Sequence, residues 1–404
     1  MPTAEPIDEF YEAAKQKFAY ISQHMSDFGG WKLGNSLDTM IDYLALALAH
    51  RDVHASAAES FGRDVSGLCK TWIYSGNPTW TWFDDLGWFV ISTGRASRQS
   101  FFGKNDLQNP FSGFSAECWK RFTGSAPYTW CRRNRDPDRF KDYGPAVDGG
   151  VWNTYWEDTP DPDKYPGDRE GDPSAGALAG IQNTVTNALY LICAQRHGDA
   201  DAAEAEWSFL NAWCSSQQQP NLWWPRNNNG ALVRERVSRV ANGKTNPGFQ
   251  EDWAWTGDQG LILGGLLGRI AKGGQDAANA RTQAKALLTG ARLSLVDARG
   301  VLQPFTTTGT PPHAAGKPPD KADYSTGTGV FWRYLLQAWN LKDPDLHGFL
   351  ASAEFKSFVE TNAKAAMADP TKSQISIAGA TLADTLSNQI AALVAASVML
   401  APPR

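Results

Sequence analysis

Two adjacent acids in an aromatic segment are the strongest chemical feature of the sequence. Asp84 and Asp85 lie within residues 80–90, where five of the other nine residues are aromatic. A solvated pair of charges is rarely surrounded by large apolar side chains. Near the start of a helix, free backbone N–H groups favour the ionised form of one carboxylate, while burial and the neighbouring charge raise the pKa of the other. The pair therefore predicts one base or nucleophile and one acid.

This chemistry fits the cleavage of a glycosidic bond. Retaining glycosidases need two carboxyl groups roughly 5 Å apart, one as nucleophile and one as acid/base. Because neighbouring helical residues point about 100° apart, Asp84 and Asp85 could approach one bound sugar from different sides. The structural alternative is that Asp84 caps the helix and Asp85 interacts with its dipole. A metal site of the terpene-cyclase type is disfavoured, because position 88 is Trp88 and no third acid follows at the required spacing.

Three amide side chains are candidates for binding sugar hydroxyls. Asn183 and Asn187 are four residues apart in a helical pattern, so both amides lie on one helix face and could reach the same ligand. The alternative is a buried pair that bonds to backbone. Gln259 could act in the same way from the start of another helix.

Tryptophan is unusually abundant, with 17 residues in the chain. Many of these rings lie in connections rich in Gly, Pro and Asn, where exposed aromatic rings usually bind a ligand. Trp82, Trp152 and Trp255 could present flat apolar faces to the CH groups of a pyranose. Packing in the core is the alternative for each of them.

The elements that would position these residues are helices. Apolar residues return every three or four positions, as in Ile41, Leu44 and Leu48. Ser36 with Thr39 is expected to open the helix that contains them. We predict twelve helices, near residues 7–25, 37–50, 56–75, 79–96, 112–123, 176–197, 201–215, 252–272, 276–292, 324–339, 345–367 and 378–399. The predicted fold class is therefore all-α.

The helices come in pairs, and no charged or low-complexity linker divides them. We therefore expect a single domain over residues 1–404, an (α/α)6 barrel with six inner and six outer helices. The absence of a strict internal repeat argues against a solenoid. A cleft is expected at one end of the inner helices, where the connecting loops gather.

The connections differ in composition. Strand patterns are short, as at residues 301–305. Non-helical stretches are predicted at residues 105–111, 132–172 and 306–321. The second is long and rich in aromatic residues, which favours a functional role. The third reads as a surface loop.

Composition excludes several classes of protein. The hydrophobic fraction of 42% and charged fraction of 20% predict a globular protein with a full core. A net charge of −5 without a Lys/Arg run argues against a nucleic-acid partner. No stretch approaches the roughly 20 apolar residues of a membrane span. The first ten residues lack signal-peptide features, which fits a cytoplasmic protein, or a secreted one whose signal was removed.

Metal, cofactor and nucleophile motifs are not evident. The five cysteines form no CxxC or Cys/His ligand spacing, which predicts neither a zinc site nor a disulfide framework. The six histidines share no motif, which argues against histidine-dependent (α/α)6 epimerases and Ser/His hydrolases. We expect a monomer that needs no metal or cofactor.

In order and spacing, these segments resemble glycoside hydrolase family 76, whose members are α-1,6-mannanases and related α-mannan transglycosylases built on an (α/α)6 barrel. The family's Asp-Asp pair followed by Trp-aromatic is matched by Asp84, Asp85, Trp88 and Phe89. Residues 149–152 are similar to its Gly-Gly-Ile-Trp segment.

Further matches extend over most of the chain. Asn183 and Asn187 resemble the family's pair of Asn residues. Residues 255–260 resemble its Thr-Tyr-Asn-Gln-Gly stretch, and residues 329–335 its late Gly-Ile-Phe-x-Arg-x-Leu helix. Departures from the pattern occur at Gln182 and at residues 257–258 and 327–328, and these affect substrate contacts more than the reaction.

The resemblance implies a retaining enzyme that hydrolyses or transfers α-mannosides, with an α-mannan oligo- or polysaccharide as substrate. Asp84 would be the nucleophile and Asp85 the general acid/base, with Asp258 as a possible third carboxylate near the cleft. Two alternatives stay open: a non-catalytic glycan-binding protein, and an (α/α)6 glycosidase of another linkage specificity. The sequence leaves endo and exo action open as well.

Overall fold

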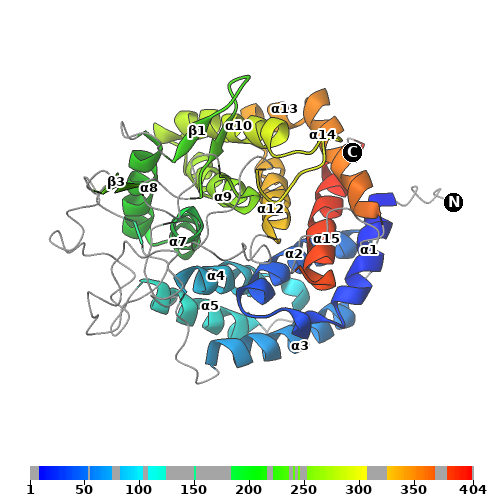
Figure 1. The fold of residues 1–404 in the computed structure, drawn as a ribbon. Coiled ribbons are helices and arrows are strands. Elements are labelled where there is room, and N and C mark those ends of the chain that lie inside the picture. Colours follow the sequence, from blue (N-terminus) through cyan, green and yellow to red (C-terminus); the bar gives the residue numbers. More distant parts are fainter. Residues whose placement is uncertain are drawn as a thin grey trace.

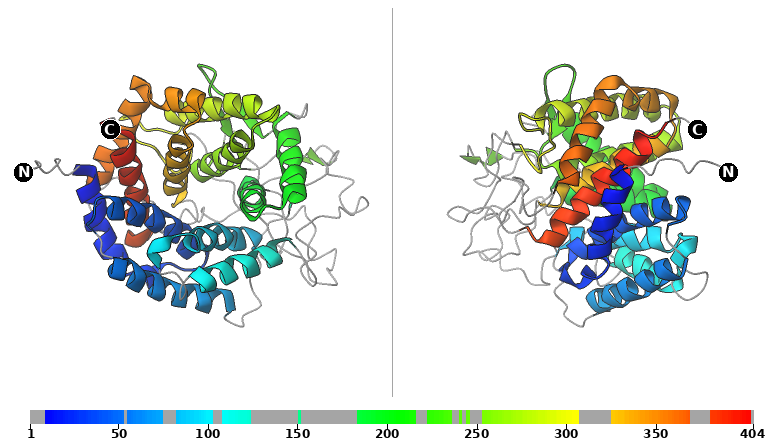
Figure 2. Two further views of the ribbon diagram at one scale, coloured as in Figure 1. Left: turned by 180° about the vertical axis from the view of Figure 1, so that it is seen from behind. Right: turned by 90° about the vertical axis from the view of Figure 1, so that its right-hand side faces the viewer.

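A computed structural model describes most of the helical part of the chain. The described residues are 9–52, 55–74, 82–102, 108–123, 150–151, 183–215, 222–235, 240–241, 244–245, 253–306, 325–368 and 380–402. Within them the helices form two concentric rings (Figure 1), seen from behind and from the side in Figure 2.

The inner ring consists of helices that alternate along the chain with outer ones. It contains α2 (Trp31–Ala49), α4 (Phe83–Ala96), α7 (Thr184–His197), α9 (Thr256–Lys272), α12 (Gly327–Asn340) and α15 (Leu382–Met399). The outer ring contains α1 (Glu9–Ile21), α3 (Ala55–Tyr74), α5 (Gln108–Thr123), α8 (Ala200–Ser215), α10 (Asp276–Ser294), α13 (Pro344–Leu350) and α14 (Ala353–Met367). Short 3-10 turns lie at Met25–Asp27 and Ser100–Phe102.

The inner ring is closed. Each of its helices packs on the next in chain order, and α15 packs on α2. Outer helices cover it, with α5 on α4, α8 on α7, α10 on α9, and both α14 and α1 on α15. This order is that of an (α/α)6 barrel, so the predicted fold class is confirmed.

The composition of the inner helices follows from their position. Helix α15 is long and apolar enough to span a membrane, but 78% of it is buried inside the protein, between its neighbours in the ring. Close packing also selects glycine: a Cβ at Gly260 of α9 would lie 2.8 Å from the Cα of Phe331 in α12. Four cysteines in the described ranges are free thiols, at positions 69, 118, 193 and 214.

All inner helices begin at the same end of the barrel. Contacts between the starts of successive inner helices show this, namely the Lys32–Asp384 ion pair (3.0 Å), the Asn388–Ser325 hydrogen bond (2.6 Å) and the packing of Trp255 against Gly327. Next to Lys32, the ring of Trp31 in α2 stacks on that of Trp88 in α4 at 5.6 Å. Six helix N-termini, each a positive dipole end, therefore gather at one end.

Each of the twelve predicted ranges contains a helix, but the observed helices begin or end at different residues in several cases. Helix α2 begins at Trp31, directly after Gly30 at φ 52°, so the expected start at Ser36 is wrong and that residue is buried inside the helix. The predicted helix 345–367 is two helices, because Ser352 caps α14 through its bond to the N–H of Phe355.

Two loop and strand predictions also need correction. Helix α5 begins at Gln108, inside the stretch predicted as a loop. Residues 301–305 form two isolated bridges, Val296 with Leu302 and Trp255 with Phe305, rather than a strand. Nearly all of the stretches 132–172 and 306–321 lie outside the described residues.

The sequence did not predict the short hairpins that follow α8. Strand β1 (Trp223–Pro225) pairs antiparallel with β2 (Ala231–Val233), and β3 (Val240–Ala241) pairs with β4 (Lys244–Thr245). Strand β2 packs closely on α10, because a Cβ at Gly290 would lie only 1.9 Å from the carbonyl oxygen of Ala231. The first hairpin is therefore fixed against the outer ring and leads the chain back to the start of the inner helices.

Candidate functional site

Asp84 and Asp85 lie in the first turn of α4, at the end of the barrel where the inner helices begin. The N-cap position is Trp82, which makes no side-chain capping bond, so the interpretation of Asp84 as the cap is wrong. Both acids are partly buried, and Oδ1 of Asp84 has no access to solvent. The free N–H groups of this turn favour negative charge on the pair.

Two further carboxyl groups belong to the same end of the barrel. Asp258 lies in the first turn of α9 and is fully buried, and Glu235, just after β2, is 4% exposed. Burial raises the pKa of Glu235 well above its usual value, and the charges of Asp258 and Asp84 raise it further. Because Asp84 and Asp258 both act on Glu235, the structure brings acids from α4, α9 and the segment after β2 together.

Glu235 is held by the first turns of two inner helices. Its carbonyl oxygen accepts a hydrogen bond from the backbone N–H of Thr184 (2.8 Å), and the hydroxyl of Thr184 donates to the carbonyl of Arg234 (2.6 Å). From α9, the amide of Gln259 bonds both backbone groups of Val233 at 2.8 Å. Gln259, which was expected to bind sugar hydroxyls, thus bonds to the backbone that positions Glu235.

The two asparagines of α7 also bond to backbone. Asn183 is the N-cap residue, and its Oδ1 accepts from the N–H of Thr186 at 3.1 Å. Asn187 accepts from the N–H of Val151 (2.8 Å) and donates to its carbonyl (3.1 Å) and to that of Asn183 (2.7 Å). These bonds correspond to the structural alternative for the pair. They fix Val151, the residue before Trp152.

The three candidate tryptophans are placed differently. Trp82 is partly buried and directly precedes the helix that carries Asp84. Trp255 is 4% exposed, and its ring packs against Gly257 and Gly327, which leaves little of its surface for a ligand. Trp152 lies outside the described residues.

Glu235 is the residue that sequence analysis missed. Its signal was the hairpin itself: the run Asn227–Gly230 between two short apolar segments is typical of a turn, and Asn228 and Asn229 both have φ of 56° there. An acid directly after the second apolar segment would then be placed at the end of a strand. Among the described residues, no three His, Cys, Asp or Glu side chains lie close enough together to hold a metal ion.

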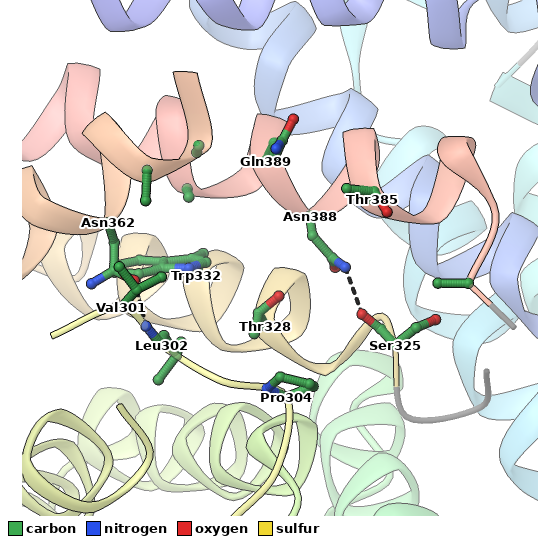
Figure 3. Close-up of a pocket in the computed structure, with 14 residues that line it drawn as sticks. Val301, Leu302, Pro304, Ser325, Thr328, Trp332, Asn362, Thr385, Asn388 and Gln389 are labelled. Atoms are coloured by element: carbon green, nitrogen blue, oxygen red, sulfur yellow. Dashed lines mark hydrogen bonds between the residues drawn. The ribbon is translucent and has the colours of Figure 1, made fainter. Parts of the chain in front are cut away.

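A separate hollow of about 610 Å³, counted with the solvent at its mouth, lies between α12, α14, α15 and the segment 301–304 (Figure 3). Two of its amide side chains bond to backbone: Asn388 donates to the carbonyl of Ser325 and accepts from the N–H of Gly329 at 3.0 Å. Asn362 accepts from the N–H of Leu302 at 2.8 Å. These bonds join the helices to the segments between them.

Comparison with known proteins gives matches at the level of structure. No family model matches the sequence, and no curated protein matches it. The structure of an α-1,6-mannanase of family 76 from a Salegentibacter species matches with a TM-score of 0.59 and 14% identity, covering 97% of this chain and all of that one. That structure is an inactive variant, with two adjacent aspartates replaced by asparagine, in complex with α-1,6-mannotriose.

Two further structures match over similar lengths. Dfg5 from Chaetomium thermophilum, in complex with glucosamine, gives a TM-score of 0.61 at 14% identity, covering 99% of this chain and 93% of its own. A family 76 α-mannanase from Bacteroides thetaiotaomicron gives 0.58 at 12% identity, covering 97% of each chain. The chain therefore has the fold of the family 76 enzymes that its sequence resembles.

Proposed function

We propose that this protein is a retaining glycoside hydrolase of the family 76 type that acts on α-mannosides, foremost α-1,6-linked mannan. The observation that carries the proposal is the position of Asp84 and Asp85 in the first turn of an inner helix, with Asp84 close enough to Glu235 to raise the pKa of that carboxyl group. The matched mannanase, inactive when two adjacent aspartates are changed, supports the assignment of the pair.

In the proposed mechanism Asp84 attacks the anomeric carbon while Asp85 protonates the leaving glycosidic oxygen. Water or an acceptor sugar, deprotonated by Asp85, then attacks the glycosyl-enzyme and releases Asp84. The first-turn N–H groups of α4 favour ionised Asp84, as a nucleophile requires. Burial and the charges of Asp258 and Asp84 raise the pKa of Glu235, which favours its neutral form and so less negative charge beside Asp84.

We assign the remaining predicted residues to three tasks. Trp82 and Trp152 offer ring faces to the sugar, whereas the fully buried Asp258 acts on the site through its charge beside Glu235. Asn183, Asn187, Trp255 and Gln259 fix the backbone around the cleft through the contacts described above. In this assignment the amides and Trp255 shape the site without contacting substrate.

The test is the reaction itself. The protein should release oligosaccharides from linear α-1,6-mannan, and proton NMR of the earliest product should show the α-anomer, because double displacement retains configuration. α-1,2-, α-1,3- and β-1,4-linked mannans serve as linkage controls. Calorimetric binding of α-1,6-mannotriose without product would instead identify a glycan-binding protein. Cleavage of only a differently linked glycan would contradict the assigned substrate.

A further inference from the structure

The hollow between α12, α14 and α15 lies apart from the carboxylate site (Figure 3). Its volume of about 610 Å³, counted with the solvent at its mouth, is within the usual range for a small-molecule site. The lining comes from the N-terminal parts of α12 and α15, the last turns of α14 and the segment 301–304, and no described residue of α4, α7 or α9 takes part. The hollow therefore lies towards the same end of the barrel as Asp84, but between the inner and outer rings.

Most side chains in the wall of the hollow are apolar. Ala366 and Ala392 contribute only methyl groups and so leave the space open. The ring of Trp332 is held in place by its stack on Phe358 at 5.3 Å. None of the described lining residues carries a charge. Because a charged ligand would lose its hydration there without gaining a partner, the hollow suits a neutral molecule with an apolar face.

Two polar side chains in the wall leave their hydrogen-bonding capacity unused. Gln389 is 8% exposed, and its Oε1 is enclosed without a partner among the described residues, so the exposed part of the side chain belongs to its other atoms. Thr328, one turn before Trp332 on the same face of α12, also bonds to no described residue. The neighbouring amides of Asn362 and Asn388, by contrast, bond to backbone. A buried amide without partners is rare and costs stability, which indicates a ligand at Gln389.

We propose that this hollow binds one neutral pyranose unit, as a free glycoside or as the terminal residue of a glycan, through the amide of Gln389 and the hydroxyl of Thr328. Sugar hydroxyls both donate and accept, and a half-turn about the last bond of Gln389 presents either its oxygen or its nitrogen to them. The CH groups of the pyranose would cover the apolar wall at Trp332. Water could satisfy the amide but would leave that wall hydrated, which is unfavourable.

This site binds sugar without cleaving it. No carboxyl group is among the described residues that line the hollow, and glycosidases need two of them. The inference therefore does not rest on the proposed reaction, which supplies only the choice of a mannoside as the first probe.

The experiment follows the alanine methyl groups of the full chain by NMR during titration with methyl α-D-mannopyranoside. The signals of Ala366 and Ala392 should shift along a saturating curve because they lie in the wall, whereas that of the buried Ala280 in α10 should not move. Glucuronate, which is charged, should leave all three unchanged. Gln389→Leu and Thr328→Val should each weaken binding by about tenfold, because each removes hydrogen bonds to the sugar. Gln275→Leu, at the exposed N-cap position of α10, is the matched control and should keep the wild-type curve.

Thermal unfolding without ligand separates binding from a structural role. Neither side chain bonds to a described residue, so Thr328→Val should keep the wild-type Tm. Gln389→Leu should raise the Tm, because it removes a buried polar group that has no partner. A Tm lowered by Gln389→Leu would assign this residue a structural role and would overturn the proposal.

Crystals soaked in the mannoside should show a pyranose ring against Gln389. The absence of saturating shifts at Ala366 and Ala392 with mannosides, glucosides and galactosides would overturn the proposal, and density without such shifts would mean binding at crystal concentration only. The outcome is distinct from that of the proposed function. A protein inactive on mannan that shows the shifts would still confirm the hollow as a sugar site, whereas an active protein without them would contradict this inference alone.

Discussion

The side chain of Gln259 and the backbone of Val233 form a reciprocal pair: Oε1 accepts from the N–H and Nε2 donates to the carbonyl, both at 2.8 Å. The same nitrogen also donates to the carbonyl of Trp255 at 2.9 Å. One amide thus joins the first turn of α9 to the strand that precedes Glu235. The position of Glu235 therefore depends on Gln259.

Replacing Gln259 with Glu should destabilise the protein. A carboxylate cannot donate, so the carbonyls of Val233 and Trp255 lose their donor in a fully buried place. We expect a loss of about 1–3 kcal/mol for each unsatisfied group, measured as the free energy of unfolding in urea. Gln275→Glu, at the exposed N-cap position of α10, is the matched control and should change stability by less than about 0.5 kcal/mol. Equal effects of the two changes would contradict the role of Gln259.

Asp84→Asn and Asp85→Asn should each abolish turnover without unfolding the protein. Removing a nucleophile or an acid/base group costs about two to four orders of magnitude in kcat. Neither carboxylate caps α4, so the Tm should stay close to that of the wild type. The measurement is the initial rate on α-1,6-mannan, and Asp64→Asn on the exposed side of α3 is the control. Wild-type rates in either variant of the pair would remove that residue from the mechanism.

Because of Glu235, the free energy of unfolding should fall as the pH rises. Its pKa is raised in the folded state, so the folded protein holds a proton that the unfolded chain releases above about pH 4.5. Its contribution to stability is full below that pH and is lost as the pH rises through the folded-state pKa. Glu235→Gln, which mimics the protonated acid, should flatten this decline. Urea unfolding at a series of pH values measures the difference, and parallel curves for both proteins would contradict it.

Asp38 and Asp42 both pair with Arg95, but we expect them to contribute differently to the free energy of unfolding. Burial raises the pKa of both carboxyl groups. For Asp38 the charges of Arg95 and Arg333 outweigh burial and lower the pKa, whereas the pKa of Asp42 remains raised. Asp38→Asn leaves Arg333 without its acid and should cost about 3–5 kcal/mol, and Asp42→Asn clearly less. The contribution of Asp38 is present above pH 3.8 and is lost as the pH falls through its lower folded-state pKa. The reverse order of the two losses would contradict this account.

Two glycine replacements should act in opposite directions. Gly290→Ala places a Cβ 1.9 Å from the carbonyl oxygen of Ala231, so either β2 or α10 must move, at a cost of about 1–3 kcal/mol. At Gly67, inside α3, a Cβ meets nothing within 4 Å, and alanine should add about 0.5–1 kcal/mol. Differential scanning calorimetry of both variants gives the comparison. A Gly290→Ala protein as stable as the wild type would show that the hairpin is not held at this contact.

Periodicity and local context were enough for much of this structure. In inner helices such as α9 and α15, apolar residues recur along most of the helix, so the presence and approximate bounds of these helices follow from the sequence. Asp84 and Asp85 could be identified from the local sequence alone, because two charged residues within an aromatic segment are unusual in any fold. The start of α2 was misplaced, because the positive φ of Gly30 decides it and Ser36 only looks like a cap.

The remaining features depend on tertiary contacts that the chain does not display locally. An Asn or Gln side chain can bond equally well to a sugar hydroxyl or to a backbone group, so residue type does not distinguish the two roles. For Asn187 and Gln259, the positions of Val151 and Val233 decide in favour of backbone. Strands of three residues carry too little alternation to be recognised. Glu235 was missed for this reason, since its place in the site follows from the hairpin before it.

The ion pair between Lys32 and Asp384 joins residues 352 positions apart in the chain, and it belongs to the contact that completes the inner ring. Neighbouring pairs such as α9 with α10 can form early because short connections link them. Docking of α15 onto α2 must wait until α15 itself has left the ribosome, and like the packing of α1 on α15 it closes a loop of more than 300 residues. Until then the apolar sides of both helices stay uncovered, so the nascent chain is exposed to aggregation up to this last step of folding.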